Sequence, residues 1–300
     1  MSSASTGNPV REVLRQGIGR LREADVPSFT LAAELLLLHV TGRDRTWIYS
    51  HPEELLSPAK IAAFFALVDR RCQGEPTQHL TGRQEFWGLE FEVTPDVLIP
   101  RPETEHVVEV ALNRLAVREL RAGRSPKLSG ESVAIVDIGT GSGCIALALA
   151  KELPSAIIYA SDISAAALGV ARRNAERLGF AARIRLLESH LFDAFLPLKF
   201  DLVVSNLPYI GRREADSLPR EVRDHEPELA LYGGEEGYEL FGALVAQAQS
   251  FLKPGGLLVM ELGHDSLPAV QPLLETPAWA NIAVTNDLAG IPRVLSAERL

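Results

Sequence analysis

The stretch VAIVDIGTGSGCIALALA, residues 133–150, decides the fold of this chain. It begins with an apolar run typical of a buried strand and ends in a run with the periodicity of a helix. Between the two runs, Gly139, Gly141 and Gly143 let the backbone turn tightly and approach a ligand closely, because a Cβ would block both. A strand, a glycine-rich turn and a helix in this order predict a ligand site at the carboxyl end of a parallel strand.

The same alternation of strand and helix patterns continues along the chain. Short apolar runs, typical of strands buried on both faces of a mainly parallel sheet, occupy residues 156–161, 183–188, 200–206 and 256–262. Helical periodicity occupies residues 144–153, 164–179 and 238–252. We therefore predict an α/β fold with a doubly wound sheet, whose ligands bind at the carboxyl ends of the strands.

The chain before residue 84 has a different pattern. Residues 10–73 have helical periodicity, with one helix ending at Gly42 and another beginning at Ser57 and Pro58. A compact helical unit of this kind serves as a partner-docking module or as a packing domain without a partner, and the pattern alone does not decide between them.

Two further segments connect this helical region to the α/β domain. Residues 85–98, rich in aromatic and β-branched side chains, predict a β-hairpin that turns at Gly88. Residues 103–105 place negative charge at the start of a helix, and residues 116–132 have the composition of an exposed loop. We therefore divide the chain into a helical domain, a hairpin linker and an α/β domain, at residues 1–83, 84–100 and 101–300.

Composition excludes several classes of protein. The 300 residues are 46% hydrophobic and 23% charged, which is ordinary globular usage and argues against disorder. The net charge of −9 argues against a protein that coats a nucleic-acid backbone. Two cysteines, Cys72 and Cys144, make neither a disulfide framework nor a zinc motif, so we expect no metal and a reducing compartment. No secretory signal and no membrane-spanning stretch are evident, and we expect a cytoplasmic protein.

The glycine-rich turn fits more than one cofactor. Asp162 follows the next strand, where a carboxylate can accept hydrogen bonds from both hydroxyls of a ribose. A nicotinamide fingerprint begun at Gly139 fails at Cys144, but the variant begun at Gly141 and ending in Ala146 fits, and a turn with a purely structural role is a further alternative. We favour S-adenosylmethionine because acidic Asp137, directly before the glycines, suits a cationic ligand better than a pyrophosphate.

A second motif follows the strand at residues 200–206. The run Asn206-Leu207-Pro208-Tyr209 suits a planar NH2 group as methyl acceptor. The Asn206 side-chain oxygen and the Leu207 carbonyl can accept its two N–H bonds, and the Tyr209 ring can cover it. Orientation then supplies much of the rate, without a strong general base. A strand-terminal turn with no catalytic role is the alternative.

With these motifs, the sequence resembles the protein-(glutamine-N5) methyltransferases of the HemK/PrmC type, which methylate the Gly-Gly-Gln glutamine of bacterial peptide chain release factors. The resemblance covers about residues 10–297. It rests on QEFWGLEFEVTPDVLIPRPETE (84–105), DIGTGSG (137–143), SNLPYI (205–210), EPELALYGGEEG (226–237) and NDLAGIPRV (286–294). LIPRPETE is the most specific piece, and it favours release factors over the sister family that acts on a ribosomal protein.

The resemblance implies a seven-stranded, mainly parallel, Rossmann-like class I methyltransferase sheet and assigns roles to residues of the motifs. Asp162 would hold the ribose, Leu191 would lie beside the adenine, and the N-terminal helices would dock the release factor. The hairpin and residues 101–105 would border the cleft. The methionine part of S-adenosylmethionine would be wrapped by Gly139, Thr140, Gly141, Ser142 and Gly143. The substrate glutamine and the chemistry would be handled by Asn206, Leu207, Pro208 and Tyr209, with Asn206 also beside the cofactor.

The sequence departs from the family pattern at two positions. Leu207 replaces the first proline of the usual Asn-Pro-Pro-Tyr, which keeps the backbone carbonyl but loses the fixed φ, so we predict a modest rate loss. His190 stands where the family usually has Asp, near the adenine amino group. Its neutral imidazole could accept a hydrogen bond there, although an imidazole facing solvent is the favoured interpretation.

Other conspicuous residues receive structural interpretations. We expect Phe86 and Trp87 to pack within the hairpin and Cys144 to be a core residue, not a nucleophile. His225 and Glu226 lack the further ligands that a metal site needs. Glu261, at the end of a strand, is structural or lines the cleft.

The leading functional hypothesis is a release factor glutamine methyltransferase that acts as a monomer, without a nucleic acid or a membrane as partner. The alternatives are a ribosomal-protein glutamine methyltransferase, a nucleic-acid adenine N6-methyltransferase, a non-catalytic cofactor-binding protein and a dehydrogenase. The acidic balance disfavours the nucleic-acid enzyme, and the intact Asn206, Tyr209 and Asp162 disfavour the non-catalytic protein.

Overall fold

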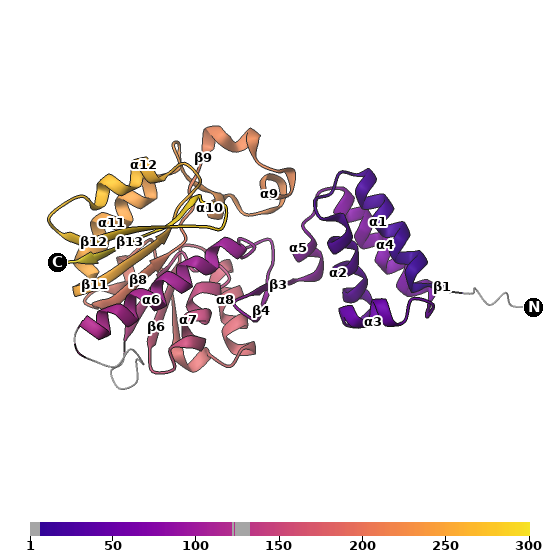
Figure 1. The fold of residues 1–300 in the computed structure, drawn as a ribbon, viewed down its shortest axis with the longest axis horizontal. Helices are drawn as coiled ribbons and strands as arrows, with labels where there is room; N and C mark the ends of the chain where they lie inside the picture. Colours follow the sequence, from indigo (N-terminus) through magenta and orange to yellow (C-terminus); the bar gives the residue numbers. More distant parts are fainter. Residues whose placement is uncertain (1–6, 122, 124–132) are drawn as a thin grey trace, which may run out of the picture. The chain divides into compact units, whose positions relative to one another are not determined.

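The computed structural model describes residues 7–121, 123 and 133–300, and it divides the chain into two units (Figure 1). One unit comprises Met1–Arg83 together with Pro219–His225, and the other comprises Gln84–Leu218 together with Glu226–Leu300. Each unit has its own buried apolar core. Within the described ranges, none of the helices has both the length and the apolar character needed to cross a membrane.

The N-terminal unit is helical, as predicted. Its elements are α1 (Val10–Glu23), α2 (Phe29–Thr41), α3 (Arg45–Ser50), α4 (Pro58–Cys72), α5 (Thr77–Thr81), α9 (Arg220–His225) and the short strands β1 (Asn8–Pro9) and β2 (Leu55–Leu56). Gly42 ends α2 with a φ of 67°, and the Ser57 hydroxyl caps α4 by accepting the Lys60 N–H at 3.4 Å. An ion pair between Arg71 and Glu221 joins α9 to the other helices.

The predicted hairpin is confirmed as β3 (Arg83–Phe86) and β4 (Leu89–Glu92). Trp87 and Gly88 form its turn, both with positive φ, as two-residue hairpin loops require. Phe86 is 1% exposed and packs edge-on against Phe91, with ring centroids 6.1 Å apart. The packing of Phe86 is that expected within the hairpin, whereas the Trp87 indole donates to Glu152 of the helix Cys144–Glu152 at 2.9 Å and so contacts the α/β unit outside the hairpin.

The prediction of a loop over residues 116–132 is wrong in its first part. Helix α6 (Glu105–Arg121) follows the short turn η1 (Pro102–Thr104) and continues through residues 116–121. Its last turns pack because Leu115 and Glu119 are buried and Arg118 bonds the carbonyl and carboxylate of Asp201. The remainder, residues 122 and 124–132, lies outside the described residues.

The second unit is built on the predicted seven-stranded sheet. Its order is β12-β13-β11-β8-β5-β6-β7, in which only β13 runs antiparallel to its neighbours. The strands are β5 (Ala134–Ile138), β6 (Ile157–Asp162), β7 (Ile184–Glu188), β8 (Phe200–Ser205), β11 (Leu252–Glu261), β12 (Trp279–Asn286) and β13 (Pro292–Arg299). The first five match the apolar runs of the sequence.

Helices cover both faces of this sheet (Figure 1). One face packs against α6, α7 (Cys144–Glu152) and α8 (Ala165–Arg177), and the other against α11 (Glu239–Phe251) and α12 (Leu267–Val270). Successive strand residues point to opposite faces, so Ile135 joins one core and Val136 the other. Burial on both faces explains why the strands are continuously apolar.

Short elements between the strands and helices complete the unit. They are β9 (Ile210–Gly211), β10 (Tyr232–Gly234), α10 (Glu228–Leu231) and the turns η2 (Ala181–Arg183), η3 (Asp193–Phe195), η4 (Arg212–Ser217) and η5 (Gln271–Leu274). β9 and β10 pair in parallel, which places the segment after β8 beside residues 232–234.

Candidate active site

The glycine-rich turn between β5 and α7 has the backbone conformation that its sequence predicts. Gly139, Gly141 and Gly143 have φ angles of 75°, 54° and 84°, in the region that favours glycine. The N–H groups of Gly139 and Thr140 both donate to the Ser161 carbonyl, at 2.9 and 2.8 Å. These bonds tie the turn to the end of β6.

Buried polar side chains form hydrogen bonds with the glycine-rich turn. Asp137 is fully buried and accepts a hydrogen bond from the Thr140 hydroxyl at 2.7 Å. Burial raises the pKa of Asp137 to about 7, against the lowering effects of Thr140 and the Ala146 N–H. The Asp137 carboxyl does not line the cavity described below. It therefore supports the turn, whereas the sequence led us to expect it near the cationic part of a ligand. The Ser142 carbonyl accepts from the Asn174 amide at 3.0 Å.

Asp162 lies at the end of β6, opposite the turn. Its two carboxylate oxygens accept the N–H groups of Gly141 and Ser164, both at 2.9 Å. Burial raises the pKa of Asp162, and these N–H groups oppose that shift. A carboxylate oxygen can accept more than one hydrogen bond, so each retains capacity for a ligand hydroxyl.

A cavity of about 290 Å³ opens at the carboxyl ends of β5, β6 and β8. Its lining brings together Thr104, Gly139, Thr140, Gly141, Ser142, Asp162, His190, Leu191, Asn206, Leu207 and Pro208. Two of the predicted site residues, Gly143 and Tyr209, do not line it. Gly143 instead permits close packing, because a Cβ there would lie 3.2 Å from Leu147 and 3.3 Å from Ala171.

The turn after β8 enters the cavity with Asn206. Its side-chain NH2 donates to the Thr104 hydroxyl at 3.2 Å, which leaves the Oδ1 acceptor for another partner. The Ser205 hydroxyl donates to the Ile138 carbonyl at 2.7 Å and ties this turn to β5. The Leu207 side chain is 5% exposed and would lie 3.2 Å from a Cβ on Gly139, so the two turns pack directly together.

Glycines of the segment 232–237 hold the same turn from its other side. A Cβ on Gly233 would lie 2.2 Å from the Pro208 carbonyl oxygen, and one on Gly237 would lie 2.5 Å from that of Tyr209. Backbone therefore packs on backbone, which restrains the turn although Leu207 lacks the fixed φ of proline. These glycines lie in the segment EPELALYGGEEG, where the sequence alone gives no sign of this packing role.

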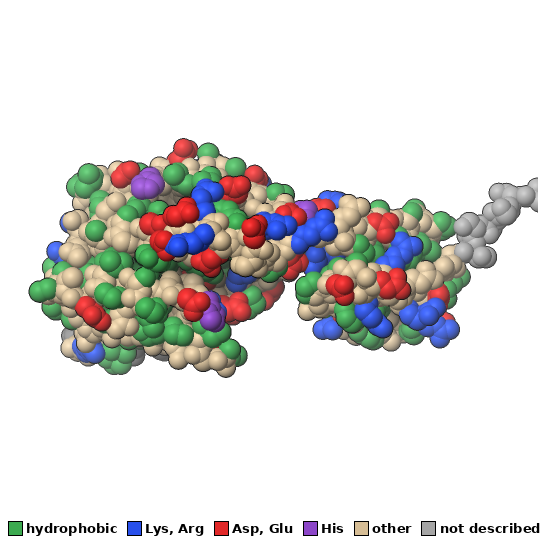
Figure 2. Space-filling view, turned by 90° about the horizontal axis from the view of Figure 1, so that it is seen from above, with side chains coloured by type: hydrophobic (Ala, Val, Ile, Leu, Met, Phe, Trp, Pro, Cys, Tyr) green, Lys and Arg blue, Asp and Glu red, His purple; other side chains and the backbone are tan. Residues whose placement is uncertain are grey.

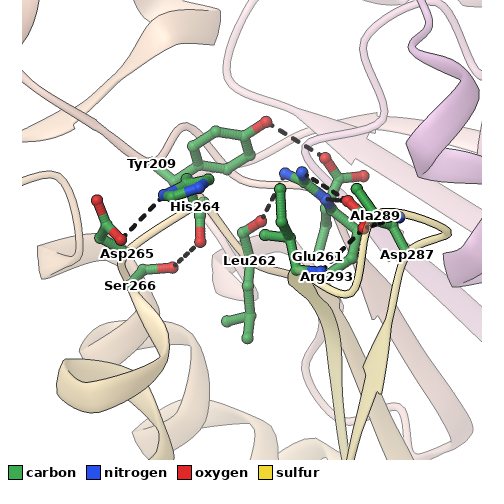
Figure 3. A network of polar contacts seen from close by, with 11 residues as sticks. Tyr209, Glu261, Leu262, His264, Asp265, Ser266, Asp287, Ala289 and Arg293 are labelled. Carbon is green, nitrogen blue, oxygen red and sulfur yellow. Dashed lines mark hydrogen bonds and ion pairs between the residues drawn. The ribbon is translucent and has the colours of Figure 1, made fainter.

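Tyr209 and Glu261 meet behind the turn, as Figure 3 shows. The Tyr209 hydroxyl donates to Glu261 at 3.3 Å, and the Tyr209 ring lies against Gly263, where a Cβ would be 2.8 Å from ring atom Cδ2. Glu261 ends β11, is 1% exposed and is absent from the cavity lining, so it does not line the cleft. Burial raises its pKa to about 7, against lowering effects of Thr104, Arg293 and Tyr209.

Glu226 fixes the segment that borders the cavity after the hairpin. Its carboxylate accepts the Ile99 N–H at 3.2 Å and pairs with Arg101, while Leu98 and Pro100 line the cavity. The strands of the hairpin do not line the cavity. Within residues 7–121, 123 and 133–300, no group of three His, Cys, Asp or Glu side chains is arranged to hold a metal.

The remaining predicted residues have distinct environments. Leu191 is 6% exposed with a φ of 46°, and its carbonyl accepts the Ser189 hydroxyl at 3.0 Å. His190 lines the cavity with a side chain that is 54% exposed. Cys144 is the first residue of α7; it is half-buried, packs against the core and also lines the cavity, so it is not fully in the core as we expected. Burial raises the pKa of its thiol to about 12, which argues against a nucleophile.

Comparison with solved structures defines the class of protein. The chain superposes on the hMettl16 catalytic domain, solved in complex with the MAT2A 3'UTR hairpin 6, with a TM-score of 0.54 at 16% identity, over 78% of this chain and 81% of that one. It superposes on a methyltransferase from Pyrococcus furiosus with a TM-score of 0.50 at 20% identity, over 71% and 90%. The fold is that of a Rossmann-like class I methyltransferase.

Sequence comparison narrows the class to one family. The PrmC N-terminal domain model matches residues 12–82, and the methyltransferase small domain model matches residues 124–220. The chain is 42% identical to the release factor glutamine methyltransferase of Koribacter versatilis, over 95% of this chain and 97% of that protein. It is 43% identical to that of Moorella thermoacetica, over 97% and 98%. The chain belongs to the release factor glutamine methyltransferase family.

Proposed function

We propose that this protein transfers a methyl group from S-adenosylmethionine to the side-chain amide nitrogen of the Gly-Gly-Gln glutamine in peptide chain release factors. The names of its relatives support this substrate. The observation that carries the chemistry is the Asn206 side chain at the cavity wall, whose NH2 group is bonded to Thr104 and whose oxygen remains as an acceptor.

The residues of the cavity fit S-adenosylmethionine. Asp162 retains an acceptor position on each oxygen for the ribose hydroxyls. The turn is open at Gly141, where a Cβ would meet nothing within 4 Å, so this backbone can approach the methionine part. Leu191 and His190 provide lining for the adenine. When bound, the cofactor would supply an electrophilic methyl group on a sulfonium sulfur.

The turn after β8 is suited to a weakly nucleophilic amide. Delocalisation of the nitrogen lone pair makes a carboxamide a poor nucleophile, so orientation must supply much of the rate. In our proposal, Asn206 Oδ1 and the Leu207 carbonyl accept the two N–H bonds of the substrate glutamine. Pro208 shapes the turn. Tyr209, which the sequence led us to expect over the planar amide, lies behind the turn and anchors it through the hydrogen bond to Glu261.

We assign the docking of the release factor to the helical domain, residues 1–83, with residues 84–100 as linker and 101–300 as the catalytic domain. The match of residues 12–82 to a family-specific N-terminal model supports a dedicated role for the helical part. On the face shown in Figure 2, Lys and Arg side chains lie among Asp and Glu side chains. A mixed charge pattern suits a protein partner better than a nucleic-acid backbone.

The test is incubation with S-adenosylmethionine labelled in its methyl group, a release factor, and the release factor with its Gly-Gly-Gln glutamine replaced by alanine. We expect label on the first protein and none on the second. DNA, RNA and ribosomal protein are offered in parallel reactions. Label on any of these instead of the release factor, or equal label on both release factors, would contradict the proposal.

A further inference from the structure

The orientation of the Asn206 amide depends on groups outside the cavity. The Asn206 NH2 donates to the Thr104 hydroxyl at 3.2 Å. Thr104 lies beside the Glu261 carboxylate and lowers its pKa, and Glu261 Oε2 is buried without a hydrogen-bond partner. Glu261 accepts the Tyr209 hydroxyl at 3.3 Å. One buried carboxylate therefore connects to both ends of the turn that the proposed function places around the substrate glutamine.

Glu261 lies where several helices and strands come together. It is the last residue of β11, and it faces Thr104 and Glu103 of η1, Tyr209 after β8 and Arg293 of β13. Figure 3 shows that Arg293 is held by Asp287, at 3.0 Å, and by the Leu262 carbonyl, at 3.5 Å.

We propose that Glu261 is a positioning residue whose carboxylate, acting through the Thr104 hydroxyl, determines which atom of the Asn206 amide faces the substrate glutamine. The proposal rests on the proposed function, because it concerns the same amide acceptor. In this proposal, neither Glu261 nor Thr104 is a catalytic residue. Glu261 lies behind the turn, and Thr104 acts through its hydrogen bond with Asn206.

The protonation state of Glu261 determines which way the hydrogen bonds between Glu261, Thr104 and Asn206 run. An ionised carboxylate can only accept hydrogen bonds, so the Thr104 O–H donates to Glu261. The lone pairs of the Thr104 hydroxyl oxygen then accept a hydrogen bond from the Asn206 NH2. Asn206 Oδ1 is then left for the substrate NH2. A protonated carboxyl can donate instead, which frees the Thr104 O–H to donate to Asn206 Oδ1. The amide then turns over and presents its NH2 to the substrate NH2, and two donors cannot bond each other.

The surroundings of Glu261 bring its pKa, and with it the change in hydrogen-bond direction, close to neutral pH. Burial raises the pKa of Glu261 to about 7, and Glu103 adds to the rise, while Thr104, Arg293 and Tyr209 oppose it. The competent direction belongs to the ionised form. Transfer should therefore increase as the pH rises through about 7 and level off above it.

A matched pair of substitutions tests the hydroxyl. Thr104→Val keeps the shape of the side chain but removes the hydroxyl, and Thr104→Ser keeps the hydroxyl. We expect Thr104→Val to lower kcat by about tenfold or more through loss of orientation. Thr104→Ser should restore most of the rate. S-adenosylmethionine affinity, measured by calorimetry, should be nearly unchanged in both variants. Wild-type kcat in Thr104→Val would overturn the proposal.

Glu261→Gln tests the carboxylate, because its amide group can donate to Thr104 at every pH. We expect a lower kcat and loss of the increase near pH 7. A merely structural role for Glu261 would leave the shape of that profile unchanged, and an unchanged profile would contradict the relay. Wild-type protein that fails to methylate the release factor would instead contradict the proposed function.

A readout without turnover keeps the two proposals separate. In ¹⁵N-labelled full-length protein, the side-chain NH2 resonances of Asn206, assigned by their loss in Asn206→Ala, should shift with pH around about 7. This shift should be absent in Thr104→Val and retained in Thr104→Ser. Resonances that do not respond to pH in the wild type would overturn the relay whatever the substrate proves to be.

Discussion

The substitution Gly233→Ala tests how the turn after β8 is held. The new Cβ would lie 2.2 Å from the Pro208 carbonyl oxygen and 2.4 Å from that of Gly237. Ordinary contact requires one backbone to move by about 1 Å, because both neighbours are main-chain atoms. Overpacking of this kind costs about 1–3 kcal/mol of stability. A misplacement of about 1 Å at the reacting groups can lower the rate by about 100-fold.

We therefore expect Gly233→Ala to lower kcat for release factor methylation by about 100-fold. S-adenosylmethionine affinity should change far less, because the backbone atoms nearest to the new Cβ belong to Pro208 and Gly237 and not to Asp162 or the glycine-rich turn. The control is Gly242→Ala in α11, where a Cβ meets nothing within 4 Å and alanine favours the helix by about 0.5–1 kcal/mol. Steady-state kinetics and thermal unfolding measure both. Gly233→Ala with wild-type kcat would refute the argument that close backbone packing positions the turn.

Three further predictions follow from individual side chains. Asn206→Ala should lower kcat by about 100-fold or more, with cofactor affinity little changed in calorimetry; near-normal turnover would exclude the acceptor role. Asp162→Asn should weaken S-adenosylmethionine binding by about 1.5–3 kcal/mol, because it removes a charged acceptor, and unchanged affinity in calorimetry would exclude the ribose contact. Glu261→Gln should stabilise the protein at about pH 8, since burial raises the folded-state pKa from 4.5 to about 7 and ionised Glu261 costs about 3 kcal/mol there. This difference should shrink as the pH falls toward 4.5, and a constant difference in melting temperature would contradict it.

Local sequence pattern was sufficient for most of the fold. The five parallel strands β5, β6, β7, β8 and β11 are rich in apolar residues because helices cover both faces of the sheet, and the caps at Gly42 and Ser57 follow local rules. The apolar pattern of the sequence did not identify β12, because β12 is an edge strand with many exposed residues. Its partner β13 is the next strand along the chain. The end of α6 was assigned to the loop because its charged residues resemble those of the segment that follows.

The site was only partly readable from sequence, for a physical reason. The glycine-rich turn, Asp162 and the Asn206 turn carry local signals, because each needs particular residues at fixed spacing. The contacts that orient them join residues far apart in the chain, as Asn206 with Thr104 and Ile99 with Glu226 do. No periodicity encodes such pairs. The role of Gly233 is equally hidden, because its φ is ordinary and it is the approach of the Pro208 and Gly237 carbonyl oxygens that excludes a side chain.

Tandem mass spectrometry of a release factor treated with the purified protein and S-adenosylmethionine can locate the transferred methyl group. We expect fragment ions to place one added methyl group on the side-chain amide of the Gly-Gly-Gln glutamine, and we expect the modification to be lost with Asn206→Ala. A methyl group on any other residue, or an unmodified release factor beside fully bound cofactor, would contradict the proposed function.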